Sequence, residues 1–238
     1  MKHLFYLIAL IFTSLLMATA APRQGKFVVE KPDMEQIKNE VNDSTSKYYY
    51  PRLMEQYEKN ETIMTLNDFR YLYLGQMFQE DFNPYRESTH TKHIEGLYYQ
   101  DKHNRAELDT IIKYAELSLK DNPFDLRQLN FLTYAYRKRG KVNMANIWQF
   151  RMNHLLEAIL STGTGLDPDN AWYVINPEHE YIVINFLGRE ADAQEFTQPY
   201  YDHITLKPAA GNTDAPKGYY FNIKNLLEEY YRKHPEQL

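Results

Sequence analysis

The amino-acid sequence predicts a mainly helical α+β fold, in which an N-terminal helical array packs on a small C-terminal antiparallel sheet. Between residues 32 and 162, apolar side chains recur at the three- and four-residue spacing that places them on one face of a helix. From Gly163 onward the composition shifts, and short segments with alternating apolar residues indicate strands. We expect residues 32–162 and 163–238 to form one compact domain together.

The first residues have the pattern of a signal peptide. Residues 1–3 form a short basic start, residues 4–17 are almost uninterruptedly apolar, and an Ala-Thr-Ala cleavage pattern follows. The apolar run is shorter than a helix that spans a bilayer, and no stop-transfer pattern follows it. We therefore expect a signal peptide over 1–20 that is cleaved near Ala20, a flexible leader over 21–31, and an exported mature chain without a transmembrane anchor.

Composition and charge argue against several classes of function. The chain has a formal net charge of -5 and a pI near 5.9, so it lacks the basic surface with which proteins neutralise nucleic-acid phosphates. It contains no cysteine, which excludes disulfides, thiol catalysis and cysteine-ligated metals. We expect no nucleic-acid partner, no metal and no cofactor.

The stretch Leu66–Tyr85 is so rich in aromatic residues that it could be either core or a binding surface. Its apolar residues cover most of the circumference of a helix, and such a helix is normally buried on more than one side. Gly75 costs about 1 kcal/mol relative to Ala in an exposed helix, and close packing of another element would offset that cost. We interpret the stretch as core, with residues 81–85 leading onto the surface.

Three more helices are predicted between about residue 106 and residue 162. Part of this region resembles a single tetratricopeptide unit, from Pro123 to about Leu156, in the order of these residues: Pro123, Leu129, Leu132, Tyr136, Gly140 and Ala145. Small residues let two helices approach closely, and large residues fill the groove between them. The resemblance implies a stacked helical hairpin and does not establish a peptide-binding groove.

The C-terminal part is predicted to contain a short extended piece over Ala171–Ile175, one helix, a two-stranded antiparallel hairpin and a final helix. Asn176-Pro177 is typical of a helix start and Gly188 of a helix end, although the β-branched residues 182–184 favour a strand instead. The segments YYDHITLK and YYFN have the pattern of strands on either side of an exposed loop. The last helix is expected from Ile223 to Lys233.

Four segments follow one another in an order that is similar to a known family. They are YYYPRLMEQY, LNDFRYLYLGQMFQEDFNPY, the STGTG loop followed by PEHEY, and YYDHITL with GYYFNI, and together they span roughly Tyr48 to Tyr231. The chain resembles an exported Bacteroidetes family catalogued as domain of unknown function 4919. This resemblance implies a periplasmic or secreted location in a Gram-negative bacterium, and it implies no particular activity or ligand.

No motif predicts a catalytic or metal site. The HEYIV segment that begins at His179 starts like a zinc-protease helix, but Val183 stands where the second histidine is required. One alternative set of metal ligands lies in a polar, loop-like segment: His90, His93, Glu95 and His103. The polarity of that segment favours solvated histidines over a metal site.

The chain contains 21 tyrosines, several of them in doublets. Because the ring of tyrosine is apolar and its tip is polar, half-buried tyrosines stabilise a surface, and outward ones can stack on a sugar or anchor a peptide. Five residues are our candidates for a binding surface: Tyr85, His179, Glu180, Tyr201 and Tyr220.

Three functions are compatible with the sequence. The leading hypothesis is a non-enzymatic envelope protein that acts in protein interactions or as a scaffold, and an exposed apolar patch would support it. The alternative is a glycan- or small-ligand-binding module, whose outward tyrosines would gather in one cleft with a few polar groups. A hydrolase is the third, and it would need four side chains from distant segments to converge: His154, His179, Glu180 and His203.

Overall fold

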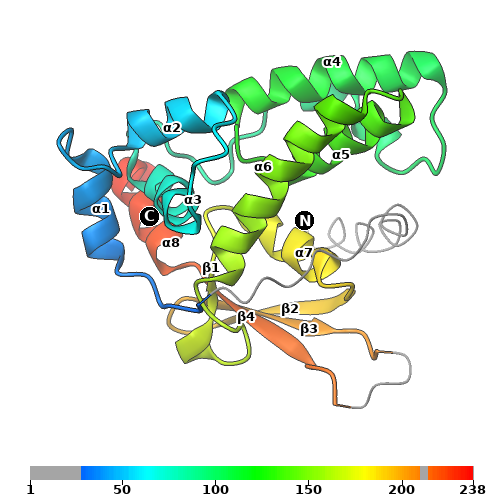
Figure 1. The fold of residues 1–238 in the computed structure, drawn as a ribbon. Coiled ribbons are helices and arrows are strands. Elements are labelled where there is room, and N and C mark those ends of the chain that lie inside the picture. Colours follow the sequence, from blue (N-terminus) through cyan, green and yellow to red (C-terminus); the bar gives the residue numbers. More distant parts are fainter. Residues whose placement is uncertain (1–27, 210–213, 238) are drawn as a thin grey trace.

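The computed structural model describes residues 28–209 and 214–237 (Figure 1). The predicted signal peptide and most of the predicted leader lie outside these residues, as do residues 210–213 of the predicted C-terminal loop. The fold is mainly helical α+β, as the sequence predicts, with the strands confined to the C-terminal part.

The N-terminal part is a helical array in two groups (Figure 1). Its helices are α1 (Met34–Asn42), α2 (Tyr50–Glu58), α3 (Leu66–Gly75), α4 (Arg105–Asp121), α5 (Leu126–Lys138) and α6 (Val142–Leu160). Helices α1 and α2 pack against α3, and α5 packs against both α4 and α6, while α3 also contacts α6 and so joins the two groups.

Side-chain caps fix where several of these helices begin. Thr65 and Asp68 form a capping box at the start of α3, and Asn104 and Glu107 form another at the start of α4. At the start of α5, the carboxylate of Asp125 accepts a hydrogen bond of 3.0 Å from the backbone N–H of Gln128. These caps satisfy backbone N–H groups that have no partner inside their helix.

The interpretation of Leu66–Tyr85 as mainly core is confirmed. Phe69 and Tyr73 of α3 are fully buried, whereas Tyr85 at the end of the stretch is exposed. A side chain at Gly75 would place its Cβ 2.7 Å from Cγ1 of Val41 on α1, so close packing against α1 accounts for this glycine.

The sheet contains β1 (Trp172–Tyr173), β2 (Ala191–Thr197), β3 (Tyr201–Leu206) and β4 (Gly218–Asn222), in the order β1-β4-β3-β2. The predicted antiparallel hairpin is confirmed by the pairing of β3 with β4. Two further strands join it: β1 pairs with β4 in the parallel direction, and β2 pairs antiparallel with β3 at the opposite edge. Strand β2 is not among the elements predicted from the sequence.

Two helices complete the C-terminal part. Helix α7 (Glu178–Phe186) confirms the helical alternative for the segment that holds the β-branched run, and it lies between the sheet and the helical array (Figure 1). Helix α8 (Lys224–Lys233) returns to the N-terminal helices. There Lys38 of α1 forms an ion pair of 2.8 Å with Glu229, which is buried.

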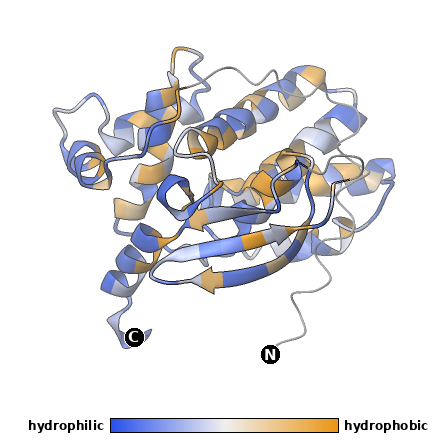
Figure 2. Cartoon of the chain, turned by 90° about the horizontal axis from the view of Figure 1, so that it is seen from below, coloured by the Kyte–Doolittle hydropathy of each residue, from blue (hydrophilic) through white to orange (hydrophobic). Residues whose placement is uncertain are grey.

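The two faces of the sheet differ. On the inner face, the buried side chains of Ile204 and Phe221 join the main core beneath α7. No helix of the described residues covers the opposite face, which we call the outer face, and in Figure 2 its strands lie in front of the rest of the molecule. In the part of the chain that the structure describes, no helix is both long and apolar enough to cross a membrane.

Candidate functional site: an acid pair behind an exposed sheet edge

Two buried carboxyl groups meet between α7 and the sheet, and we call Glu180 and Asp202 the acid pair. Glu180 is 0% exposed, and in the described structure neither of its carboxyl oxygens receives a hydrogen bond from a donor. Its side chain lies within hydrogen-bonding reach of the Asp202 carboxyl on β3, which is 7% exposed. Two carboxylates accept hydrogen bonds without donating any, so this contact requires a proton on one of them.

Burial decides which carboxyl holds that proton. It raises the pKa of Glu180 well above its ordinary value, and the neighbouring Asp202 raises that pKa further. Burial also raises the pKa of Asp202, but hydrogen bonds from Glu180 and Gln194 oppose this effect. The proton therefore resides mainly on Glu180, and Asp202 is the acceptor.

Polar and aromatic side chains surround the acid pair. Gln194 on β2 lies close enough to Asp202 to lower the pKa of its carboxyl, and the hydroxyl of Tyr181 donates to Oε1 of Gln194 at 2.6 Å. Both Tyr181 and Tyr85 lie close enough for the charges of Glu180 and Asp202 to raise their pKa values, although burial is the larger cause. No lysine or arginine is among the groups that shift the pKa of either member of the pair. The acid pair thus has aromatic neighbours and no counter-cation in the described structure.

His179 faces away from the acid pair, into the helical array. Its Nδ1 lies 2.7 Å from the hydroxyl of Tyr73, which in turn accepts a hydrogen bond of 3.3 Å from the backbone N–H of Ile175. The ring also hydrogen-bonds the backbone of Phe124. Burial lowers the pKa of His179 to about 3, so the ring is neutral near pH 7 and holds α7 on the array.

The tyrosine candidates divide between the two sides of the sheet. Tyr85, on the inner side, is 52% exposed and packs edge-on against Tyr230 of α8, with ring centroids 4.9 Å apart. Tyr201 and Tyr220 lie on the outer face, where Tyr220 stacks on His203 at 4.2 Å. The structure therefore places Tyr85 on the same side of the sheet as Glu180, near enough for their charges to interact, and it places Tyr201 and Tyr220 on the outer face.

Strand β2 forms an exposed edge of the sheet. Its residues from Asp192 to Phe196 are all exposed, and Phe196 retains 51% of its accessible surface. Asp192 lies at a bulge, beyond which the pairing with β3 is regular. An edge strand presents unpaired backbone groups, so it is a surface on which another strand can pair.

The pairing register shows which groups of β2 point outward. The hydroxyl of Thr205 on β3 bonds both the N–H and the C=O of Ala193, at 3.2 and 3.3 Å, so the backbone groups of Ala193 face β3. Because these groups alternate along a strand, those of Glu195 also face β3, and those of Gln194 and Phe196 point away from the sheet.

The histidines considered for a hydrolase or a metal site do not converge. His203 lies on the outer face of β3, and His154 packs at a tilt against Phe150 within α6. His93 stacks on Tyr114, and His103 hydrogen-bonds Tyr134. Across residues 28–209 and 214–237, no three acidic or histidine side chains come close enough together to hold a metal ion.

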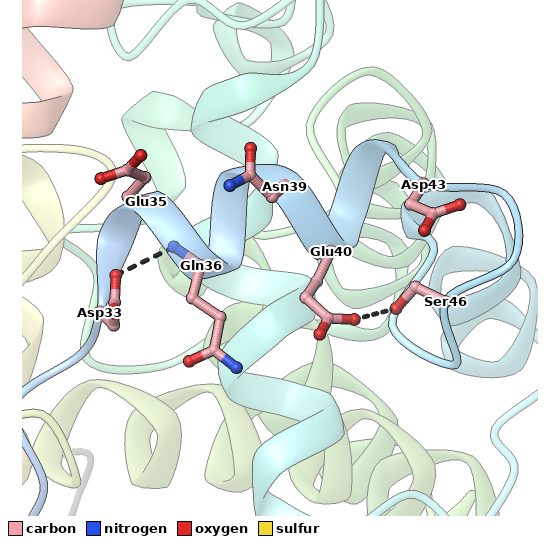
Figure 3. A pocket seen from close by; sticks show the side chains of 7 residues that line it. All are labelled: Asp33, Glu35, Gln36, Asn39, Glu40, Asp43 and Ser46. Atoms are coloured by element: carbon pink, nitrogen blue, oxygen red, sulfur yellow. Dashed lines mark hydrogen bonds between the residues drawn. The ribbon is translucent and has the colours of Figure 1, made fainter.

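A separate hollow runs along α1 (Figure 3). It is lined by polar side chains: Asp33, Glu35, Gln36, Asn39, Glu40, Asp43 and Ser46. Several of its acids already have partners, since Asp33 caps α1, Asp43 accepts from Thr45, and Ser46 donates to Glu40. We therefore assign no site to this hollow.

One comparison with known proteins gives a match. The model of the family described as "Domain of unknown function (DUF4919)" matches residues 35–232. The chain belongs to this family. The match includes the acid pair, β2 and the outer face, and its description assigns no activity to any of them. No curated protein and no solved structure gives a significant match.

Sequence patterns single out Glu180 but not its partners. Asp202 occupies an inward position in an alternating strand, where an apolar residue is normally expected, and that break in the pattern is the one signal that could have drawn attention to it. Gln194 lies in a strand of polar residues without alternation. Nothing in the sequence indicates that these side chains meet.

Proposed function

We propose that this protein is an exported, non-enzymatic interaction module that binds an extended segment of a partner protein along the edge of β2. The observation that carries the proposal is the exposure of β2, with the backbone groups of Gln194 and Phe196 directed away from the sheet. A partner strand would satisfy these N–H and C=O groups in register, which is the mode of recognition known as β-augmentation.

Charge complementarity defines the chemistry of the partner. Asp192 and Glu195 are exposed on β2, the strand carries no basic residue, and neither acid forms an ion pair in the described structure. Opposite charges across paired strands are favourable, whereas like charges directly opposite each other are not. The partner segment is therefore expected to carry lysine or arginine and few acidic residues.

The outer face extends the surface offered by β2. Glu195 lies opposite His203 on that face, and His203 stacks on Tyr220, so an acidic edge adjoins an aromatic area. Tyrosine and histidine rings there can contact the outward side chains of a bound segment. The surface combines main-chain hydrogen bonds for affinity with side-chain contacts for selectivity.

The location and the helical hairpin belong to the same proposal. The signal-peptide pattern of residues 1–20 supports export to the periplasm or to the exterior of a Gram-negative bacterium. The α5–α6 hairpin, in which Ala135 and Ala145 are fully buried, supports a tetratricopeptide-like packing of these two helices. In this proposal the helical array is the support that holds α7 and the sheet in place.

Affinity capture with one pair of variants at Phe196 tests the proposal. The mature protein, from Ala21 onward, is crosslinked in native envelope extract, and the retained molecules are identified by mass spectrometry. Phe196→Pro removes an outward N–H but breaks no bond to β3, since proline is tolerated on an edge strand. Phe196→Val also removes the ring and keeps that N–H. We expect a basic partner to be retained by the wild type and by Phe196→Val and lost with Phe196→Pro.

Two results would contradict the proposal. In one, both variants retain the same partner equally, which would place the interaction elsewhere. In the other, both lose it equally, which would assign the interaction to the ring of Phe196 and not to the strand edge. Circular dichroism and thermal unfolding of both variants establish that the sheet is intact.

A glycan-binding module is the second candidate, and it is favoured by the aromatic residues of the outer face. Tyr201, His203 and Tyr220 lie side by side on β3 and β4, and each retains part of its surface. Rings in such an arrangement can stack on sugars. Retention of glycans alone in the capture experiment, with loss of binding in a Tyr201→Ala, Tyr220→Ala double variant, would favour this function over strand docking.

A further inference from the structure

We propose that the acid pair binds an organic cation, an ammonium or guanidinium group, between Glu180 and Asp202. The inference deepens the proposed function and rests on it in one respect, since a basic side chain of the docked segment would be the natural source of that cation. The site itself can be tested without the partner.

Among the described residues, the carboxyl group of Glu180 lacks the hydrogen-bond donors that a buried carboxyl requires. Its carboxyl group is completely buried and aimed at Asp202, yet neither oxygen has a donor in the described structure. A proton on Glu180 satisfies one oxygen through Asp202 and leaves the other without a hydrogen bond. Because buried polar groups in proteins nearly always have partners, this oxygen marks a place where a donor is missing.

Within the described residues, the acid pair also lacks a positive charge beside it. Two acids meet in the interior, and no lysine or arginine of the described structure acts on either of them. Ammonium and guanidinium groups carry several N–H donors and a positive charge, so they supply both missing elements at once. A metal ion is disfavoured, because the described structure offers no third acidic or histidine ligand at this place.

The side chains around the acid pair suit a cation. Tyr85 and Tyr181 lie near the pair, and the faces of aromatic rings attract cations. Gln194, whose side chain lies close enough to Asp202 to lower its pKa, is exposed on β2 and belongs to the proposed docking edge. Its position defines a route of entry, in which the side chain of Gln194 swings outward and the cation takes its place beside Asp202.

Binding is expected to release a proton. Without the cation, Glu180 holds the proton that it donates to Asp202; with the cation in place, both carboxyls are ionised and the proton passes to solvent. In the free protein, only one of the two carboxyl groups is ionised. In the bound state, both are ionised, because the positive charge of the cation compensates for the second negative charge. Release of a proton on binding is therefore the signature of this site.

Carboxyl ¹³C chemical shifts report this change directly. The mature protein, labelled at glutamate and aspartate, is titrated at pH 7 with Nα-acetyl-arginine amide, with Nα-acetyl-lysine amide and with putrescine, against sodium chloride of equal ionic strength. We expect the Glu180 carboxyl resonance to move from its protonated to its ionised position with at least one organic cation and not with sodium. The arginine and lysine amides distinguish guanidinium from ammonium, and putrescine tests whether a free diamine suffices.

Matched variants make the result specific. Glu180→Gln keeps the shape of the side chain and its hydrogen bond to Asp202 but cannot ionise, so we expect at least a tenfold loss of affinity and no proton release. Glu178→Gln changes an exposed carboxyl on the same helix and should bind as the wild type does. A Glu180 resonance that stays protonated at saturating cation, or equal affinities of Glu180→Gln and the wild type, would overturn the proposal.

The outcome is distinguishable from that of strand docking. Phe196 pairs opposite Asp202, so Phe196→Pro and Phe196→Val both remove a ring beside the acid pair, and only Phe196→Pro blocks the outward N–H of β2. The two variants should therefore bind the small cations equally. A wild type that binds the arginine amide but captures no partner would support the cation site and contradict the docking surface. If the wild type captures a partner that Phe196→Pro does not, but no cation ionises Glu180, the docking surface is supported and the cation site is contradicted.

Discussion

Gly163→Ala is expected to destabilise the protein by about 3 kcal/mol, because the backbone around this residue has no room for a side chain. A Cβ at this position would lie 2.2 Å from the carbonyl oxygen of Asn170 and 2.7 Å from that of Ala171. Both obstacles are main-chain atoms, so the turn after α6 would have to move. That movement would strain the hydrogen bond of 3.0 Å between Nε1 of Trp172 and the carbonyl oxygen of Gly163, which ties the turn to β1.

Chemical denaturation of Gly163→Ala and Gly96→Ala provides the measurement and its control. A Cβ at Gly96 would meet no heavy atom within 4 Å, so this second variant is expected to keep the free energy of unfolding within about 0.5 kcal/mol of the wild type. If Gly163→Ala also stays within that range, the packing of the turn against β1 is looser than the structure indicates.

Glu180→Gln is expected to make the protein more stable than the wild type at pH 8 and equally stable near pH 4. The pKa of Glu180 is raised in the folded state, mainly by burial and then by Asp202. Between the ordinary pKa of glutamate and this raised value, the folded state holds a proton that the unfolded state has released. The wild type therefore loses stability as the pH rises through that interval, at a rate of about 1.4 kcal/mol per pH increment of one.

The variant removes this dependence because glutamine cannot ionise. The free energy of unfolding, measured by denaturant titration between pH 4 and pH 8, should fall less steeply for Glu180→Gln than for the wild type. Other groups still contribute to the slope of the variant: the raised pKa values of Asp202 and Asp125 make stability fall with pH, and the lowered pKa of His179 makes it rise. These contributions are shared with the wild type, so the prediction concerns the difference between the two curves. Glu178→Gln should follow the wild-type slope. If the curves of Glu180→Gln and the wild type are parallel, the folded state does not raise the pKa of Glu180, and the prediction is wrong.

The helices could be predicted because their physical signals are local. Leu108, Ile111 and Ala115 follow the helical period in α4 and are buried as that period requires. The β-branched residues 182–184 favour a strand by propensity, yet they lie in α7, where burial of Val183 and Ile184 against the core outweighs the small difference in intrinsic preference. Whether such a segment forms a helix or a strand is determined by long-range packing, which cannot be read from the local sequence.

The candidate site could not be predicted for the same reason. Strand β2 is exposed on both faces, so it lacks the alternation by which a strand is recognised, and it is defined only by its pairing with β3. Glu180 and Asp202 come from different elements, and the fold alone brings them together. The zinc-like HEYIV segment illustrates the opposite case, since His179 lies on a helix as the motif requires but is hydrogen-bonded to Tyr73 in the core.

Amide hydrogen exchange at Gln194 and Phe196 is the most direct measurement of the central claim, that β2 is an edge on which a partner strand pairs. In the free protein, these two amides should exchange fast, while that of Glu195, which faces β3, exchanges more slowly. In the complex isolated by affinity capture, both outward amides should slow by at least about tenfold. Unchanged exchange at both positions in a complex that remains intact would contradict docking on β2.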